Sequence, residues 1–241
     1  MRGWWREIAG LVLPVACGGC GLPRTALCEE CARQLAGPGP SRVRPRPEPA
    51  GLPVVFAAAC YEDAVRALLL AHKERGALEL AGPLGGALAR AVRAVMPEAL
   101  GGPEPVLLIP VPSARRAVRA RGHDATRRVA MAAAGALRRT GTPATALPVL
   151  RQRREVADQS GLTARRRLAN LSGALEVGAG AERLLEGRRA VLVDDLMTTG
   201  ASLVEAARAL RAAAPAHGVG PVRTAAAVVA APPLSFGVIR N

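Results

Sequence analysis

The fold of this chain is decided by the stretch Ala190-Val-Leu-Val-Asp194-Asp195-Leu-Met-Thr198-Thr199-Gly200-Ala201-Ser202. Its apolar beginning predicts a strand that is buried on both faces of a sheet. The segment after the two carboxylates predicts a tight loop and then a helix over 203–211. A helix N-terminus carries unpaired N–H groups and a partial positive charge, so this loop is suited to hold an anion. Gly200 lets the backbone close around the anion, because no side chain blocks it.

The acid pair and the loop complement each other as two parts of one site. Hydroxyl and N–H groups of the loop can hold a phosphate, and two adjacent carboxylates can accept hydrogen bonds from the two hydroxyls of a ribose. We therefore predict a ribose-5-phosphate site, in which the diol contacts Asp194 and Asp195 and the phosphate contacts Thr198, Thr199, Gly200, Ala201 and Ser202. The alternative is a buried strand that ends in an acidic turn without a ligand.

This thirteen-residue pattern resembles the 5-phosphoribosyl-1-pyrophosphate (PRPP) motif of type I phosphoribosyltransferases. Two other protein classes also place acids after a hydrophobic strand, and neither fits. A P-loop NTPase needs G-x-x-x-x-G-K-[ST], whereas the only lysine of this chain is Lys73, within His-Lys-Glu-Arg-Gly. A phosphoacceptor domain places its acid pair near its start, whereas this pair lies in about the last fifty residues.

Apolar runs alternate with helical stretches rich in Ala, Leu and Arg along most of the 241 residues. Strands are expected over 54–61, 106–110, 147–150, 189–194 and 222–229, and helices over 64–71, 84–96, 126–139 and 203–213. This alternation predicts an α/β fold with a mainly parallel central sheet flanked by helices, which binds ligands at the carboxyl ends of its strands. The length allows one such domain and a small appendage.

The expected division of the chain has four parts. Residues 1–36 form a cysteine-containing segment, and residues 37–53, rich in Pro, Gly and Arg, form a semi-rigid linker. The phosphoribosyltransferase-like domain takes residues 54–231, and residues 232–241 form a tail.

A second loop follows the strand expected over 106–110. Its sequence, Val111-Pro112-Ser113-Ala114-Arg115-Arg116, places two arginines directly after a buried strand. Arginine grips pyrophosphate oxygens in a bidentate manner, so Ser113, Arg115 and Arg116 are expected to bind the pyrophosphate of PRPP. Lys73 is expected to touch a phosphate as well, with an ordinary helix-end lysine as the alternative. His123 could be a catalytic acid or a structural histidine.

Two C-x-x-C pairs, Cys17/Cys20 and Cys28/Cys31, lie seven residues apart. Two such pairs can close a tetrahedral zinc site, and a short segment without its own core would take folding free energy from the metal. Because all four ligands come from the protein, we predict structural rather than catalytic zinc. A redox dithiol or disulfide pair is the alternative.

The net charge of +14 is concentrated in the middle of the chain, where residues 112–170 hold fourteen arginines and three acidic residues. Such a basic region suits polyphosphate or nucleic acid, although an arginine-rich solvated surface would look similar. No segment reaches the ~18–20 apolar residues that cross a bilayer, so no membrane insertion is expected. We predict a cytoplasmic protein with reduced thiols.

Nearly the whole chain resembles the ComF family of competence-associated, phosphoribosyltransferase-like proteins. The resemblance rests on the C-x-x-C-G start, the segment from Tyr61 to Lys73, and a signature that includes Arg121 and Gly122. It also rests on the spacing of Gln159, Leu162, Arg167 and Asn170. His123-Asp124-Ala125 stands where the family has an aromatic residue, Asn and Gln.

The resemblance implies a PRPP-binding phosphoribosyltransferase, with Mg²⁺ accompanying PRPP, structural zinc, and an acceptor that is unknown. It also implies a link to DNA uptake. The first alternative is therefore a non-catalytic factor that binds PRPP and single-stranded DNA and contacts the competence machinery. Few aromatic residues are available for base stacking, which argues against it. A purely structural zinc adaptor is the second alternative.

Overall fold

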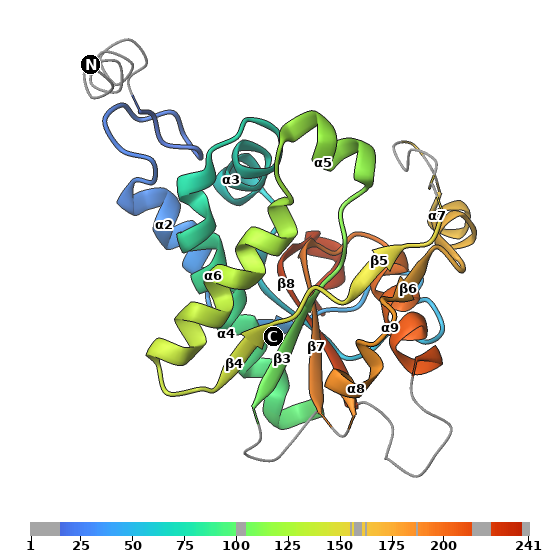
Figure 1. Ribbon diagram of the computed structural model, residues 1–241. Helices are drawn as coiled ribbons and strands as arrows, with labels where there is room; N and C mark the ends of the chain where they lie inside the picture. The colour runs from blue at the N-terminus through green and yellow to red at the C-terminus, as the bar shows by residue number, and fades with distance from the viewer. Residues whose placement is uncertain are drawn as a thin grey trace, which may run out of the picture.

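The computed structural model describes residues 15–99, 105–154, 156, 161, 163–186, 188–213 and 223–237. A six-stranded sheet lies at the centre, with helices on both of its faces (Figure 1). The strand order is β1-β2-β8-β7-β3-β4; β1 pairs antiparallel with β2, and the other four pairings are parallel. The expected fold class, a mainly parallel sheet flanked by helices with a cysteine cluster near the N-terminus, is confirmed.

The six strands of the central sheet are β1 (Ser41–Arg42), β2 (Val55–Cys60), β3 (Val106–Pro110), β4 (Ala144–Ala146), β7 (Arg189–Leu196) and β8 (Arg223–Ala231). A separate antiparallel pair consists of β5 (Leu150–Gln152) and β6 (Leu175–Val177). The α-helices are α2 (Glu29–Ala36), α3 (Asp63–Glu74), α4 (Ala81–Ala99), α5 (Arg115–Arg121), α6 (Ala125–Arg139), α7 (Ala164–Leu171), α8 (Glu182–Leu185) and α9 (Ala201–Ala212). Two 3-10 turns, η1 (Leu78–Leu80) and η2 (Pro233–Ser235), complete the description.

Alternation along the central strands gives the sheet two buried faces. In β7, Val191 and Val193 belong to the core on the side of α3, α4 and α6, whereas Ala190 and Leu192 belong to the core on the side of α9. Because both faces of the sheet are covered, the sequence of β7 is a continuous apolar run and does not alternate between polar and apolar residues.

The strand expected over 147–150 is wrong. The strand that pairs with β3 is β4, which ends at Ala146, before the expected strand begins. Leu150 begins β5, which belongs to the smaller sheet. Pro148 separates the two strands, and a proline has no N–H to donate to a sheet ladder. The apolar run therefore joins two short strands instead of forming one.

Residues 37–53 lie against the domain. Val43 is buried and forms an isolated bridge with Phe236, and Arg44 N–H donates to the carbonyl of Ser235. Leu52 and Pro45 pack beside the loop that leads into α9. The segment assigned to a linker and the start of the segment assigned to a tail thus meet at the edge of the sheet.

No helix in the described ranges is both long enough and apolar enough to cross a bilayer.

Candidate functional site

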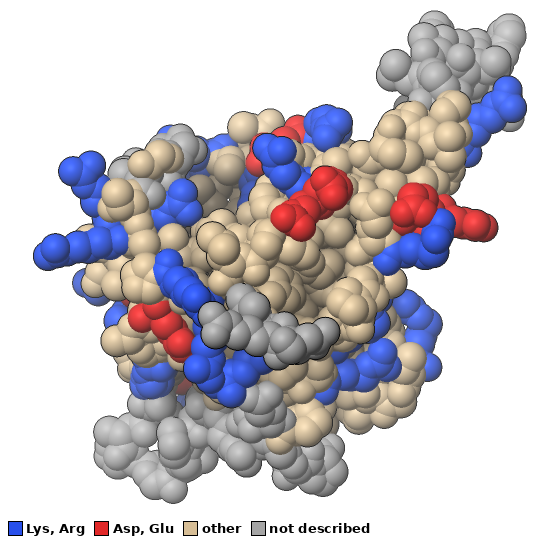
Figure 2. Space-filling view, turned by 180° about the vertical axis from the view of Figure 1, so that it is seen from behind, with Lys and Arg blue, Asp and Glu red and all other residues tan. Residues whose placement is uncertain are grey.

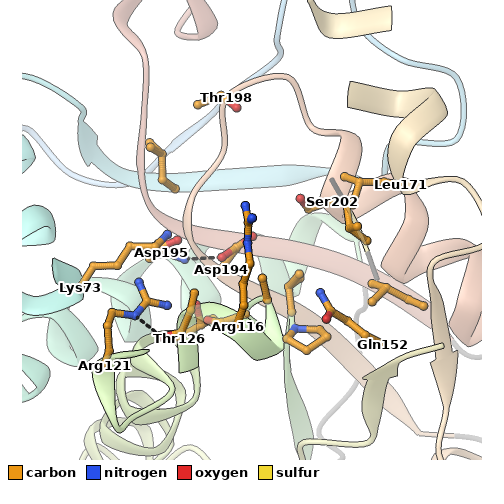
Figure 3. Close-up of a pocket in the computed structure, with 18 of the residues that line it drawn as sticks. Lys73, Arg116, Arg121, Thr126, Gln152, Leu171, Asp194, Asp195, Thr198 and Ser202 are labelled. Carbon is orange, nitrogen blue, oxygen red and sulfur yellow. Dashed lines mark hydrogen bonds and ion pairs between the residues drawn. The ribbon is translucent and has the colours of Figure 1, made fainter. Parts of the chain in front are cut away.

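A cavity of about 380 Å³ opens at the carboxyl ends of β3 and β7 (Figure 3). These strands pair in parallel, with Pro110 opposite Val193, so the loops that follow them lie side by side. The cavity wall combines residues from β7 and its loop, from the loop after β3, and from α3 and α5. Those that the sequence singled out are Lys73, Ser113, Arg116, Arg121, Asp194, Asp195, Thr198 and Ser202. A volume of this size is typical of small-molecule sites.

The two aspartates form the floor of the cavity together with one lysine. Asp195 is buried, and its Oδ2 lies 2.7 Å from Nζ of Lys73, which reaches across from α3. The N–H of Asp195 donates to Oδ1 of Asp194 at 2.8 Å. Lys73 therefore faces the acid pair, while its position on the cavity wall also leaves it beside any anion bound there.

Burial opposes ionisation of both carboxyls, and neighbouring charges shift their two pKa values in opposite directions. Burial and the adjacent Asp195 charge raise the pKa of Asp194 well above its usual value. At Asp195 burial acts in the same upward direction, but the ammonium of Lys73 overrides it and lowers the pKa. The two aspartates raise the pKa of Lys73 in turn, against the effect of its burial. The pair thus holds one ionised carboxylate and one that resists ionisation.

Asp195→Asn is expected to reduce the free energy of unfolding at pH 7 by about 1–3 kcal/mol, because it leaves Lys73 without its partner in a partly desolvated place. Asp194→Asn is the matched control and should not reduce the free energy of unfolding. The raised pKa of Asp194 means that its ionisation opposes folding. Chemical denaturation measures both. The Asp195 contribution is present above the unfolded pKa of about 3.9 and is lost as pH falls through the lower folded pKa. Equal stability of both variants would contradict this assignment.

The loop after β7 is shaped for an anion. Gly200 adopts φ +76° and caps α9, so the N–H groups of Ala201 and Ser202 begin the helix without intrahelical partners. The segment from Asp194 to Leu203 encloses a small hollow of about 30 Å³. Thr198, Thr199 and Ser202, which carry hydroxyl groups, are among the residues that line it. This arrangement favours a phosphate at the start of α9.

Gly200→Ala is expected to weaken phosphate binding at least tenfold and to destabilise the protein. An added Cβ would lie 2.9 Å from Leu52 Cδ1, and φ +76° disfavours any residue with a side chain. Gly21→Ala is the control, because Gly21 also has positive φ but an added Cβ meets nothing within 4 Å. Isothermal calorimetry with PRPP and thermal unfolding measure the two effects. Equal losses in the two variants would show that backbone strain alone, not the close packing at Gly200, is responsible.

Arg167 connects α7 to this loop. Its Nη1 donates to Thr198 Oγ1 at 3.0 Å, and its Nε is buried with no hydrogen-bond partner among the described residues. The carbonyl of Asn170, on the same helix, accepts a hydrogen bond from Arg154. Gln159 and Leu162, the other members of that spaced set, lie outside the described residues. Among the described members of the set, Arg167 has a hydrogen bond to the loop.

The loop after β3 divides its residues between the cavity and the scaffold. Arg116 extends along the cavity beside Asp194 (Figure 3). Arg115 does not line it; its guanidinium donates to the carbonyl of Gln152 at 2.8 Å. Ser113 lines the cavity and donates to Asp124 Oδ1, the carboxylate that also caps α6.

The signature around residue 121 joins α5 to α3. Arg121 is largely buried, and its guanidinium pairs with Glu74 at 3.0 Å. Gly122 ends α5 in the left-handed conformation, φ 75°. The ring of His123 faces the carbonyls of Arg121 and His72 and does not line the cavity, which favours its structural reading.

Several wall residues escaped the sequence analysis because no motif marks them. They are Glu74, Thr126, Gln152, Leu171 and Leu175. Gln152 and Leu175 come from the β5–β6 pair, whose position depends on long-range packing against α9 rather than on local pattern. Leu52 and Pro45, which back the phosphate loop, also lie in a segment without any recognisable motif.

The four N-terminal cysteines converge on one point. Their sulfurs all lie within 4.8 Å of one another, close to the roughly 3.8 Å separation that tetrahedral Zn–S bonds of about 2.3 Å require. N–H groups of Cys28 and Cys31 point at sulfurs of Cys17 and Cys28. Although burial opposes it, such backbone hydrogen bonds lower the pKa of Cys17 to about 6, so a thiolate is available at neutral pH. The donor set fits a structural zinc ion.

Close packing around the cysteines explains their glycines. A Cβ on Gly19 would lie 2.6 Å from the sulfur of Cys31, so only glycine lets the first turn approach the second pair. Cys17, Cys28 and Cys31 are buried in the same core as α3 and α4. The cysteine segment is therefore continuous with the main core instead of forming a core of its own.

Comparison with known families supports the interpretation of β7 and its loop. Residues 128–233 match the family model of the phosphoribosyl transferase domain. The match includes the acid pair, the phosphate loop and Arg167, and leaves out Lys73, the loop after β3 and the cysteines. It supports a type I phosphoribosyltransferase-like protein. A search of the curated proteins found no significant match.

Proposed function

We propose that the cavity binds PRPP and that the protein transfers the phosphoribosyl group to a nucleophilic acceptor. One observation carries the proposal: an acid pair at the end of β7 and a phosphate-shaped loop at the start of α9 share one cavity with the arginine-bearing loop after β3. The family match over residues 128–233 covers the first two of these parts.

In this proposal each part of PRPP has its own partners. The 5-phosphate contacts the loop from Thr198 to Ser202, and the ribose hydroxyls donate to the carboxylates of Asp194 and Asp195. The pyrophosphate lies toward Ser113 and Arg116, with Lys73 in reach. Arg167 holds Thr198 of the loop through its Nη1. Arg115 belongs to the scaffold that orients this wall, through Gln152.

The chemistry follows from positioning and charge. The bond between C1 and the pyrophosphate oxygen breaks, and the electron pair leaves with pyrophosphate. The acceptor then donates a lone pair to the oxocarbenium-like C1 and loses its proton to solvent. The ionised carboxylate of Asp195 stabilises the positive charge, and guanidinium groups stabilise the leaving group. Mg²⁺, for which carboxylate and phosphate oxygens are the preferred ligands, would neutralise part of the pyrophosphate charge when bound.

Phosphorus NMR of PRPP with Mg²⁺ tests the transfer. Free pyrophosphate should appear only when an amine or nitrogen-heterocycle acceptor is added, and Arg116→Ala should slow its release at least tenfold. Arg119→Ala is the matched control, because this exposed arginine of α5 does not line the cavity. PRPP that binds but never releases pyrophosphate with any acceptor would argue for a binding protein instead of a transferase.

The finer ComF-type assignment rests on the resemblance described above. It predicts zinc in the cysteine cluster, a cytoplasmic location, and a role in DNA uptake with single-stranded DNA as a partner. The surface offers the charge for the last of these: Lys and Arg outnumber Asp and Glu on the face seen in Figure 2. Retention of a single-stranded oligonucleotide that weakens steeply with salt, without pyrophosphate release, would favour the non-catalytic factor.

A further inference from the structure

A buried carboxylate on α9 lies one turn beyond the phosphate loop. Glu205 is 3% exposed and does not line the cavity proposed to bind PRPP, although Ser202, on the preceding turn, does. Its oxygens accept hydrogen bonds from the N–H of Leu175 at 2.9 Å and from the guanidinium of Arg208 at 2.8 Å. Burial raises the pKa of Glu205, but Arg208 and the N–H groups of Leu175 and Gly173 together lower it below its usual value. The chemistry proposed above gives this ionised carboxylate no role.

Glu205 and Arg208 together form a clamp on one residue of β6. Nη2 of Arg208 donates to the carbonyl of Leu175 at 2.8 Å, so both backbone groups of Leu175 bond to side chains of α9. Hydrogen bonds to charged groups are stronger than those between neutral groups, which favours a fixed position for β6. Leu175 itself lines the cavity. The clamp thus joins the helix that begins at the phosphate loop to a second wall of the same cavity.

The strand that pairs with β6 is in turn bonded to the start of α5. Gln152 of β5 lies opposite Leu175 and lines the cavity with it. Its Oε1 accepts the N–H of Arg115 at 3.3 Å, and its carbonyl accepts the guanidinium of the same arginine at 2.8 Å. The first N–H groups of a helix have no intrahelical partner, and Ala114 offers α5 no side-chain cap. Gln152 therefore caps α5 from a neighbouring strand.

The position of α5 depends on such polar contacts. None of its residues is buried, so apolar packing contributes little to holding it in place. Its start is bonded to Gln152, and its end is paired with Glu74 through Arg121. Arg116 follows Arg115 in the chain and extends along the cavity beside Asp194 (Figure 3). A shift of the β5–β6 pair would therefore move Arg116 relative to the acid pair.

We propose that Glu205 and Arg208 are positioning residues for the pyrophosphate half of the PRPP site. By holding Leu175 they hold the β5–β6 pair, and through Gln152 and Arg115 they set the place at which the guanidinium of Arg116 meets the pyrophosphate. The inference rests on the proposed function, which assigns the pyrophosphate to the loop after β3. The phosphate loop and the acid pair belong to β7 and the start of α9, so loss of the clamp should spare the ribose-5-phosphate half.

Calorimetric titration of two ligands into the full-length chain tests this selectivity. The first is PRPP with Mg²⁺, and the second is ribose 5-phosphate, which lacks the pyrophosphate. Arg208→Ala should weaken PRPP binding about tenfold, because displaced groups bind poorly, and should change ribose 5-phosphate affinity less than about twofold. Arg211→Ala is the matched control: it removes an exposed arginine from the next turn of α9, outside the cavity, and should leave both affinities unchanged.

Two further variants examine the clamp itself. Glu205→Gln keeps an oxygen that can accept the N–H of Leu175 but loses the charge that holds Arg208, so it should show a smaller loss that is again confined to PRPP. Arg208→Ala/Arg115→Ala should lose no more PRPP affinity than the more damaging of its two single variants, because both substitutions act through the same connection.

Three results would overturn the inference. Equal loss of both ligands in Arg208→Ala would mean that α9 and its phosphate loop are disturbed as a whole. Unchanged affinities in Arg208→Ala and Glu205→Gln would leave the clamp with a purely structural role. Additive losses in the double variant would show that Arg208 and Arg115 act independently. A wild-type protein that binds neither ligand would overturn the proposed function itself, whereas one that binds both leaves that function standing whatever the variants show.

Discussion

Removal of zinc from the metal-loaded protein is expected to lower the free energy of unfolding by several kcal/mol. Three of the four cysteines are buried in the core that also contains α3 and α4. Without the metal, no bond links the four sulfur atoms that lie within 4.8 Å of one another. At neutral pH a thiolate at Cys17 would also remain buried without a cation. Loosening of this segment would spread to α3, which carries Lys73.

Thermal unfolding before and after a chelator measures this effect, together with metal analysis of the purified protein. Cys17→Ser should lose the metal, whereas Cys60→Ser, at the end of β2 and outside the cluster, should keep it. Metal retention should also weaken as pH falls, because protons then compete with the metal for the cysteine sulfurs. A protein that contains no metal, and whose mass is lower by two hydrogens for each pair of cysteines, would instead support the disulfide alternative.

Asp194→Asn/Asp195→Asn is expected to weaken PRPP binding tenfold or more. The ionised Asp195 would accept a charge-assisted hydrogen bond from a ribose hydroxyl, worth ~1.5–3 kcal/mol, and a tenfold loss needs only ~1.4 kcal/mol. The effect should grow as pH rises, since the raised pKa of Asp194 means that its carboxylate forms more fully at higher pH.

The control for this variant removes two acidic charges elsewhere. Glu29→Gln/Glu79→Gln changes two exposed residues that lie outside the cavity and should bind PRPP as the wild type does. If both double variants lose affinity equally, the loss reflects the overall charge. If neither loses affinity, PRPP does not contact the acid pair.

The central part of the fold could be predicted because its signals are local. The run over residues 190–202 carries a buried strand, an acid pair, a glycine with positive φ and a helix start within a few residues. The cysteine cluster was predictable for the same reason, since the spacing of two C-x-x-C pairs itself limits the geometry.

The parts that could not be predicted depend on contacts between distant segments. Arg115 and Arg116 look equivalent in sequence, yet the helical turn at the start of α5 directs one to Gln152 and the other to the cavity. Lys73 lies 122 residues from Asp195 along the chain, and only the packing of α3 on the sheet brings them together. Val43, in the Pro- and Gly-rich segment 37–53, likewise pairs with the distant Phe236.

Calorimetric titration of PRPP with Mg²⁺ into the zinc-loaded wild-type protein is the most direct test of the central claim. We expect saturable binding of one PRPP per chain, which inorganic phosphate at high concentration reduces by competing for the loop at the start of α9. A folded, zinc-loaded protein that gives no binding signal with PRPP would contradict it.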